Sequence, residues 1–493
     1  MGKENRMKTI AVIGAGIVGS FLAYDLTQYE EVEVILFEKH GDVAQETSKA
    51  NSAIVHAGYD PVDGTLKAKL NKRGAKMYQN ICKQLGCGYQ ACGGYVLASN
   101  EEEVEILQEL YARGKKRGIT VEIKEREEVV KNEKNLSKHI RKALWVPDTA
   151  IITPWEVCEA LVEEALWNGL QLHLHEEVLD IKACEKGYVI RSDKGQYSVD
   201  MLVNAAGLGA QKIMEMVEAE SLFTITPKRG QYYVLAKRSQ PYVSHVLYPA
   251  PSKAGKGVLA VPTIHGNILL GPTSEVLKKV DNATTTSGLQ EVQEKVEKII
   301  QHVPYQEVIH SYSGCRPTGN NNDFYIEESR RCKGIFHLGC IDSPGLASAP
   351  AISEYVNFIE IRTIYFLFYV FLDKSLTFHK KKHIVHRQKP LIMRNLSETK
   401  QQALIQKHPG YGHIVCYCEQ ISEQEVVDCI HRKCGAHSIA GVKMRVRPGM
   451  GKCQGGYCEV EIAKLLAREL QIPLHEVQYD EDSYYEVAKE GRR

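Results

Sequence analysis

The first forty residues change from apolar to polar in a regular order. Residues 8–13 (KTIAVI) form a short, β-branched apolar run, which favours a buried parallel strand. The glycine-rich hexapeptide GAGIVG follows at once, and the next ten residues have the apolar spacing of a helix. A second apolar run, VEVILFE, ends at Glu38. We therefore predict a strand, a glycine turn, a helix and a second strand.

This order, closed by an acidic residue, is the fingerprint of a dinucleotide-binding fold. Gly14 permits the tight turn, Gly16 lets the backbone approach a pyrophosphate, and Gly19 lets the helix pack on the strand. The helix N-terminus offers N–H groups and a positive dipole to phosphates. Glu38 follows Gly19 by 19 residues, where a carboxylate accepts hydrogen bonds from a ribose diol. The fingerprint alone fits FAD and NAD equally.

Further segments have regular patterns. Two of them predict helices: residues 102–117, which are amphipathic, and EVCEALVEEALWNG within 151–175. Residues 227–236 and 257–271 predict strands. Two others, 201–210 and 334–352, run from an apolar strand into small residues, which would let a loop lie against a cofactor.

Seven motifs occur in order within residues 8–356: GAGIVG, ETSKANSAIVHAGYD, NAAG, PKRGQYYVL, VPTIHGNILLGPT, GCRPTG and IDSPGL. Together they resemble the FAD-dependent amino-acid-oxidase-like superfamily, and within it the anaerobic-type glycerol-3-phosphate dehydrogenases and the related 2-hydroxyglutarate oxidases. The resemblance implies FAD and an α/β fold with a Rossmann-like FAD-binding lobe and a mixed-sheet substrate lobe. It places the oxidoreductase in residues 1–356. We expect the FAD lobe at about 7–90, 145–225 and 310–356, and the substrate lobe at about 91–144 and 226–309.

The resemblance also implies which residues contact FAD. They are Gly14, Ala15, Gly16, Ile17, Val18, Gly19, Glu38, Lys39, Ser48, Asn51, Ser52, Val178, Ala206, Gly207, Gly314, Ser343, Pro344, Gly345 and Leu346. The last three stand at the expected start of a helix, where backbone N–H groups could face the flavin.

Oxidising an alcohol with a flavin requires a hydride to leave carbon and a proton to leave oxygen. Histidine is the usual base for the second step. His56, in the motif that resembles the family's flavin-facing loop, is our leading candidate, and His265 is the second. Arg316 in GCRPTG resembles the family arginine that holds a substrate phosphate or carboxylate. Lys228 and Arg229 are further candidates for binding the anion.

These residues predict an enzyme that oxidises a small anionic hydroxy substrate. The resemblance favours sn-glycerol 3-phosphate, with dihydroxyacetone phosphate as the product. Because phosphate and carboxylate make similar demands on arginine, L-2-hydroxyglutarate, another 2-hydroxyacid or an amino acid stays an alternative. A non-catalytic electron-transfer subunit is a further alternative, and the presence of both His56 and Arg316 argues against it.

The C-terminal part carries a second set of chemistry. Cys416 and Cys418 form a CxC pair, and Cys453 and Cys458 follow after a gap of 34 residues. Four thiolates in two close pairs can bind a [2Fe–2S] cluster or a tetrahedral zinc, and the tight CxC spacing favours iron–sulfur. Between the pairs, Ser422 and Glu425 predict a capping box at the start of a helix.

This segment resembles the bacterioferritin-associated-ferredoxin-like [2Fe–2S] domain, which we expect to be small, mainly helical and contained in residues 396–480, before a tail at 481–493. A cluster takes one electron at a time. The pairing of flavin and cluster therefore suggests that electrons leave to a redox partner, such as a pyridine-nucleotide reductase subunit or a quinone-linked protein.

Composition narrows the remaining possibilities. With 62 basic and 61 acidic side chains, the chain has no charge excess that would suggest nucleic acid. The N-terminus has no apolar signal core, so we expect a cytoplasmic protein, with peripheral attachment to the membrane's inner face as an option.

Residues 357–395 form an atypical linker whose apolar run, IYFLFYVFL, is too short to span a bilayer. Residues 357–386 could be an interfacial anchor, a buried element or a frame-shifted stretch.

Overall fold

A computed structural model describes residues 7–251, 257–356, 379–481 and 483–485. Two compact units divide the chain. The larger comprises Met1–Lys39 with Val43–Val385, and the smaller comprises His40–Asp42 with His386–Arg493. The finer boundaries given above for the lobes, linker and tail stay predictions.

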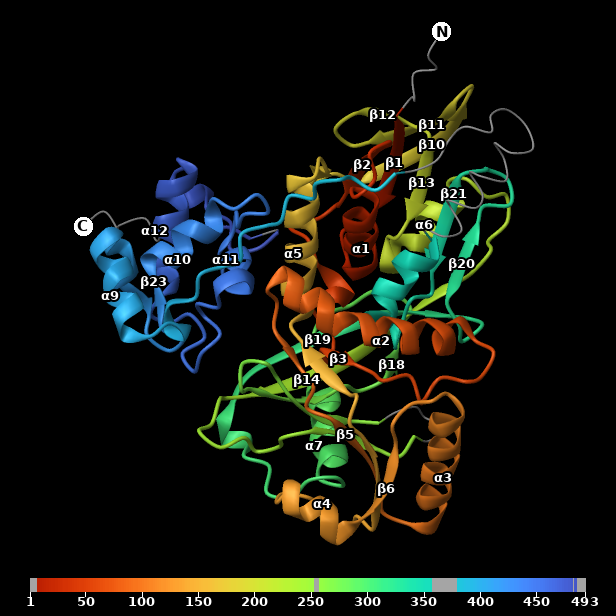
Figure 1. Cartoon of the computed structure of the whole chain (residues 1–493), viewed down its shortest axis with the longest axis vertical. Helices are drawn as coiled ribbons and strands as arrows, with labels where there is room; N and C mark the ends of the chain where they lie inside the picture. Colours follow the sequence, from red (N-terminus) through yellow and green to blue (C-terminus); the bar gives the residue numbers. More distant parts are fainter. Residues whose placement is uncertain (1–6, 252–256, 357–378, 482, 486–493) are drawn as a thin grey trace. The chain divides into compact units, whose positions relative to one another are not determined.

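The larger unit contains a mostly parallel sheet whose strands come from distant parts of the chain (Figure 1). Its order is β20 (Tyr325–Glu328), β21 (Ile335–Gly339), β13 (Met201–Asn204), β1 (Lys8–Ile13), β2 (Val32–Phe37) and β9 (Gln171–His173), with only the β20–β21 pair antiparallel. The central strands are apolar along nearly their whole length because both faces of the sheet are covered. The predicted strand over 8–13 is confirmed.

Two kinds of element cover this sheet. Helix α1 (Ile17–Leu26) packs beside β1 and β2 and against α5 (Pro154–Trp167) (Figure 1). A smaller antiparallel sheet of β10 (Val178–Cys184), β11 (Gly187–Ser192) and β12 (Gln196–Val199) shares an apolar core with side chains of β1 and β2. This is the Rossmann-like lobe that the glycine fingerprint predicts.

A second, mixed sheet forms the other lobe of this unit. Its order is β18 (Glu275–Val276), β14 (Ile225–Leu235), β17 (Ile268–Gly271), β16 (Leu259–Pro262), β15 (Val246–Pro249), β5 (Gly94–Ala98), β7 (Lys142–Val146) and β6 (Glu122–Glu125), and β19 (Val308–Gly319) also pairs with β14. Successive side chains of β5 enter different cores: Tyr95 and Leu97 lie in one, Val96 and Ala98 in the other. Helix α7 (Thr286–Val296) contributes to the first core and α3 (Glu101–Lys116) to the second, so both faces of the sheet are covered.

The smaller unit is mainly helical. It contains α9 (Glu398–Lys407), α10 (Glu423–Ile430), α11 (Ile439–Val446), α12 (Glu459–Leu470) and a hairpin of β22 (Ile414–Cys416) and β23 (Ile421–Ser422). Ser422 caps α10: its hydroxyl accepts from the Glu425 backbone, and the Glu425 carboxylate accepts from the Ser422 backbone at 2.8 Å. The predicted capping box is therefore confirmed.

Residues 379–385 of the atypical linker belong to the larger unit. The Lys381 Nζ donates to the backbone oxygen of Asn168 at 2.7 Å, and His379 bonds Glu31. Lys381 is thus held by a contact within the protein. Residues 357–378 lie outside the described part of the chain, so the interpretations of the apolar run stay open. In the part that is described, no helix is long and apolar enough to cross a membrane.

His337 on β21 makes stability sensitive to acid. Its side chain is fully buried, and desolvation lowers its pKa to about 4. An unfolded histidine binds a proton near pH 6.5, so the stability that neutral His337 allows is present above that pH and is lost as pH falls toward 4. The shift corresponds to at most about 3 kcal/mol.

We expect His337→Gln to flatten this loss, measured as the melting temperature of the larger unit between pH 7.5 and 4.5. The exposed His139→Gln serves as the control. An equal loss of melting temperature in the wild type and in both variants would show that another group sets the acid sensitivity.

Candidate functional site

The predicted nucleotide fingerprint is assembled at the carboxyl ends of β1, β2 and β13. Gly14 has a left-handed φ of 102°, and a Cβ there would lie 2.7 Å from the Ala205 carbonyl oxygen. A Cβ at Gly19 would lie 1.9 Å from the Gly14 oxygen, so α1 approaches the turn as closely as glycine allows. Helix α1 begins after Gly16 with no acidic residue in its first turn. This leaves a glycine cradle at a positive helix end, which fits a pyrophosphate.

Two side chains complete this cradle. The Glu38 carboxylate, buried at the end of β2, accepts from the Ala15 backbone N–H at 2.8 Å. The Ser48 hydroxyl accepts from the Ile17 N–H at 2.9 Å. Both therefore lie directly beside the turn, as the family resemblance implies for residues that contact the cofactor.

The loop after β2 is fixed by its own polar side chains. Asn51 donates to the backbone oxygens of Thr47 and Ser48, and the Ser52 hydroxyl lies 3.1 Å from that of Tyr232. Lys39 pairs with Glu46 at 2.8 Å on the same side of the lobe.

The other expected cofactor residues fall into two groups. Ala206 packs on Gly14, and a Cβ at Gly314 would lie 2.1 Å from the Ala50 oxygen, so both lie against the same region. Ser343 and Pro344 precede a helix over 345–356, and Leu346 accepts a hydrogen bond from buried Tyr78. Val178 instead lies in the core below β10, while Gly207 opens a short turn after β13.

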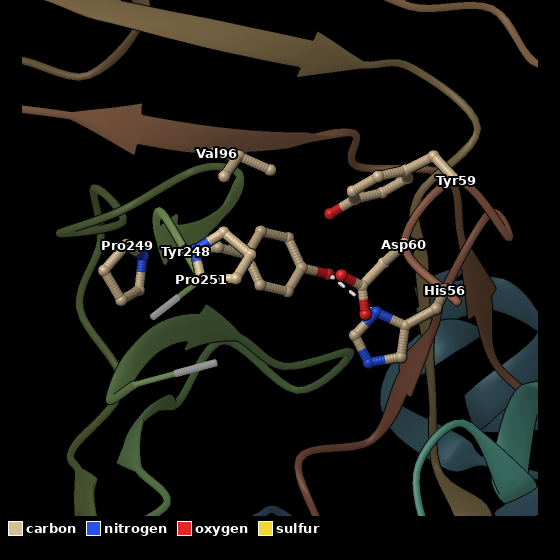
Figure 2. A pocket seen from close by; sticks show the side chains of 7 residues that line it. All are labelled: His56, Tyr59, Asp60, Val96, Tyr248, Pro249 and Pro251. Carbon is tan, nitrogen blue, oxygen red and sulfur yellow. Dashed lines mark hydrogen bonds between the residues drawn. The ribbon is translucent and has the colours of Figure 1, made fainter. Parts of the chain in front are cut away.

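His56 lines a small cavity together with Tyr59, Asp60, Val96, Tyr248, Pro249 and Pro251 (Figure 2). It follows the short strand β3 (Ile54–Val55), which pairs with β8 (Ala150–Ile152). The imidazole Nδ1 lies 3.4 Å from the Tyr248 hydroxyl. Among the described residues, the other three catalytic candidates do not line this cavity.

Arg316 and Arg229 have different surroundings although they stand on neighbouring strands. The Arg316 guanidinium donates to the Thr273 backbone oxygen at 2.9 Å and to that of Lys228 at 3.4 Å. Arg229 is 4% exposed, and burial alone would lower its pKa. Its pairs with the carboxylates of Glu275 and Asp281 outweigh this effect and raise the pKa. Arg229 therefore ties β14 to the following loop, and this geometry favours a structural role over the predicted binding of substrate.

His265 lies in the turn between β16 and β17. Its Nε2 is 3.2 Å from the hydroxyl of Thr153, the residue that precedes α5. That contact joins the turn to the helix start, and His265 is not among the residues that line the His56 cavity.

Sequence patterns did not single out two tyrosines that contact Asn51 and Ser52. Tyr232 and Tyr312 stack with ring centres 4.6 Å apart, and the Tyr312 hydroxyl donates to the Asn51 backbone oxygen at 2.9 Å. The only sequence signal was their place within or beside the quoted motifs. The pairing of β14 with β19 that sets them face to face appears only in the structure.

The four predicted cysteine ligands lie in the hairpin and in the loop before α12. The Sγ atoms of Cys418 and Cys453 are 3.7 Å apart, close to the roughly 3.8 Å between two thiolates on one tetrahedral metal ion. Cys458 donates a hydrogen bond to Cys416, which lowers the pKa of the Cys416 thiol. In the residues described, no three ligand-type side chains are placed to hold one metal ion. Two close thiol pairs are the ligand set that a [2Fe–2S] cluster requires.

Comparison with known proteins agrees with both sites. The family model "FAD dependent oxidoreductase" matches residues 9–358. The chain belongs to this family of FAD-dependent oxidoreductases. The model "BFD-like [2Fe-2S] binding domain" matches residues 414–468. FAD and a [2Fe–2S] cluster are therefore the cofactors, and the predicted recognition, fold class and cofactors are confirmed.

Individual relatives extend this similarity. A glycerol 3-phosphate dehydrogenase of Caloramator mitchellensis is 40% identical over 481 residues, which cover 97% of this chain and 98% of that protein. A glycerol 3-phosphate oxidase of Mycoplasma pneumoniae is 32% identical over 358 residues, covering 70% of this chain and 92% of that one. The solved structure of the dithionite-reduced L-α-glycerophosphate oxidase of the same organism, with FAD bound, superposes with a TM-score of 0.71 at 28% identity, over 78% of this chain and all of that one.

The cysteine assignment in this family member can be tested by one exchange. Cys453→Ser should remove the cluster's visible absorbance and the electron paramagnetic resonance signal of the dithionite-reduced protein, while FAD stays bound. The control is Cys429→Ala, a buried cysteine of α10 outside the motif, which should keep both. A cluster signal of wild-type intensity in Cys453→Ser would refute the assignment.

Proposed function

We propose that this oxidoreductase converts sn-glycerol 3-phosphate to dihydroxyacetone phosphate. The observation that carries the proposal is the 40% identity to a glycerol 3-phosphate dehydrogenase along 97% of the chain, because that match includes the cysteine module as well as the FAD lobe. The oxidase relative covers only 70% of the chain.

The site residues can supply the chemistry that this reaction needs. FAD, which the glycine turn from Gly14 to Gly19 would hold, would supply a hydride acceptor for the carbon that carries the secondary hydroxyl. His56 takes the proton of that hydroxyl, which is the usual task of a histidine base. Two of the five N–H groups of Arg316 donate to backbone oxygens, and the other N–H groups of its guanidinium are suited to binding a phosphate.

We further propose that the electrons leave through the [2Fe–2S] cluster to a redox partner protein or a quinone-linked acceptor. The support is chemical: a cluster accepts single electrons, and this chain carries a complete set of four cysteines for one.

Steady-state turnover with an artificial electron acceptor tests the choice of substrate. We expect kcat/KM for sn-glycerol 3-phosphate to exceed that for L-2-hydroxyglutarate and for neutral glycerol by at least about a hundredfold. Against neutral glycerol, this margin has the size expected when the Arg316 guanidinium is left without an anionic partner. Against L-2-hydroxyglutarate, the expectation rests on the 40% identity to a glycerol 3-phosphate dehydrogenase, compared with 30% to an L-2-hydroxyglutarate dehydrogenase. A higher kcat/KM with L-2-hydroxyglutarate or with an amino acid would contradict the proposal.

A further inference from the structure

Three polar side chains converge in the cavity beside His56. Tyr248, at 3% exposure on β15, presents its hydroxyl to the imidazole Nδ1 at 3.4 Å. The carboxylate of Asp60 points toward the same hydroxyl and the same ring (Figure 2). Val96 and two prolines form the apolar remainder of the wall. A carboxylate, a phenol and an imidazole thus meet in one small cavity.

The backbone that carries His56 and Asp60 is clamped at several points. The Asn71 side chain donates to the His56 carbonyl oxygen at 2.6 Å. Arg117 donates to the Gly58 oxygen at 2.7 Å, and Arg113 to the Asp60 oxygen at 2.6 Å. These donors come from α2 (Leu66–Leu85), from α3 and from Arg117, the residue that follows α3, so two helices hold His56 and Asp60 in a fixed relation to each other.

The phenol can relay an interaction between the other two groups. Burial raises the pKa of Tyr248 well above 10, and nearby Tyr59, Cys92 and Asp60 add to the effect. The hydroxyl therefore keeps its proton at neutral pH, and can donate one hydrogen bond while accepting another. If it accepts from Nδ1–H, its own proton is directed toward the Asp60 carboxylate.

We propose that Tyr248 and Asp60 are positioning residues that fix the tautomer of His56. The Tyr248 oxygen accepts from Nδ1–H and so makes Nε2 the basic nitrogen, and the Asp60 carboxylate stabilises the imidazolium that forms when Nε2 takes the proton. This inference rests on the proposed role of His56 as the base, and it adds two residues that no sequence motif assigned to catalysis.

The surrounding charges determine the direction of the expected effect. Among the described residues, the titratable groups placed around His56 and its loop include Asp60, Tyr59, Tyr248, Cys92, Lys72, Arg113 and Arg117. Both arginines bond backbone oxygens, and Arg117 is also paired with Asp63. An opposite charge close to a histidine favours its protonated form, so removing the Asp60 charge should make the base weaker.

The experiment measures the limiting rate of anaerobic flavin reduction by sn-glycerol 3-phosphate from pH 5 to 9. In Tyr248→Phe and in Asp60→Asn, we expect the acid limb of the profile to move down by about 0.5–1 pH unit and the plateau to fall about tenfold. The double variant should shift the limb no further than the larger single shift, because the two groups act in series. Tyr59→Phe removes another hydroxyl from the same cavity and should leave the limb in place.

Two sets of results separate this inference from the proposed function. The relay is wrong, and the base assignment stands, if His56→Gln slows flavin reduction while Tyr248→Phe and Asp60→Asn keep the wild-type acid limb and plateau. The same conclusion follows if Tyr59→Phe shifts the acid limb as far as those two variants do. If His56→Gln itself reacts at the wild-type rate, the base assignment fails. Flavin content, measured for every variant, shows whether each has folded, and the conservative Asp60→Glu should restore part of the shift.

Discussion

Replacing Gly19 with alanine should give a protein that no longer retains FAD. The new Cβ would lie 1.9 Å from the Gly14 oxygen, and 3.1 Å from its carbonyl carbon. The clashing atoms belong to the backbone of Gly14 and cannot rotate away. Helix α1 must therefore move away from the glycine turn at its N-terminus. Overpacking of this kind costs about 1–3 kcal/mol in stability, and the displaced helix end can no longer meet a pyrophosphate. The measurement is the ratio of flavin to protein after purification.

A matched glycine provides the control for this exchange. Gly209, in the turn after β13, has a helical φ of −84°, and a Cβ there would meet only the Ala206 Cβ at 3.8 Å. Gly209→Ala should therefore keep its flavin. A Gly19→Ala protein with a full complement of FAD would show that the fingerprint does not hold the cofactor.

Replacing His56 with glutamine should slow substrate-driven flavin reduction by about 10²–10⁴-fold, the usual contribution of a general base. Glutamine keeps a polar group of similar length near the Tyr248 hydroxyl, so the cavity should stay folded and FAD should stay bound. The measurement is anaerobic stopped-flow reduction of the flavin at saturating sn-glycerol 3-phosphate.

His265→Gln is the competing test because sequence patterns offered both histidines as the base. His265 contacts Thr153 outside the cavity, so its exchange should change the rate by less than about threefold. If His265→Gln lost more activity than His56→Gln, the two assignments would have to be exchanged.

Local sequence patterns predicted the parts of this molecule that local forces determine. The strand over residues 8–13 and the glycine turn after it were predictable because the strand is buried on both faces and the turn has a strict steric demand. The capping box of Ser422 and Glu425 was predictable for the same reason, since both partners lie within one helical turn. The cysteine pairs were also predictable, because the spacing of the ligand residues can be read directly from the sequence.

The contacts between residues far apart in the chain could not be predicted from the sequence. His56 and Tyr248 are 192 residues apart, and their contact depends on β15 pairing with β5 across the substrate lobe. Arg229 and Arg316 looked equivalent as cations. The partners of Arg229 are acidic residues 46 and 52 positions away in the chain. Its guanidinium charge is therefore already paired with two carboxylates within the folded protein.

The most direct measurement is an anaerobic titration of the purified holoprotein with sn-glycerol 3-phosphate, followed by visible absorbance and electron paramagnetic resonance. The account predicts that substoichiometric substrate bleaches the flavin and that a reduced [2Fe–2S] signal then develops. In Cys453→Ser, the bleaching should persist without the signal. A flavin that stays oxidised at excess substrate, or a bleached flavin beside a cluster that dithionite reduces but substrate never does, would contradict the account.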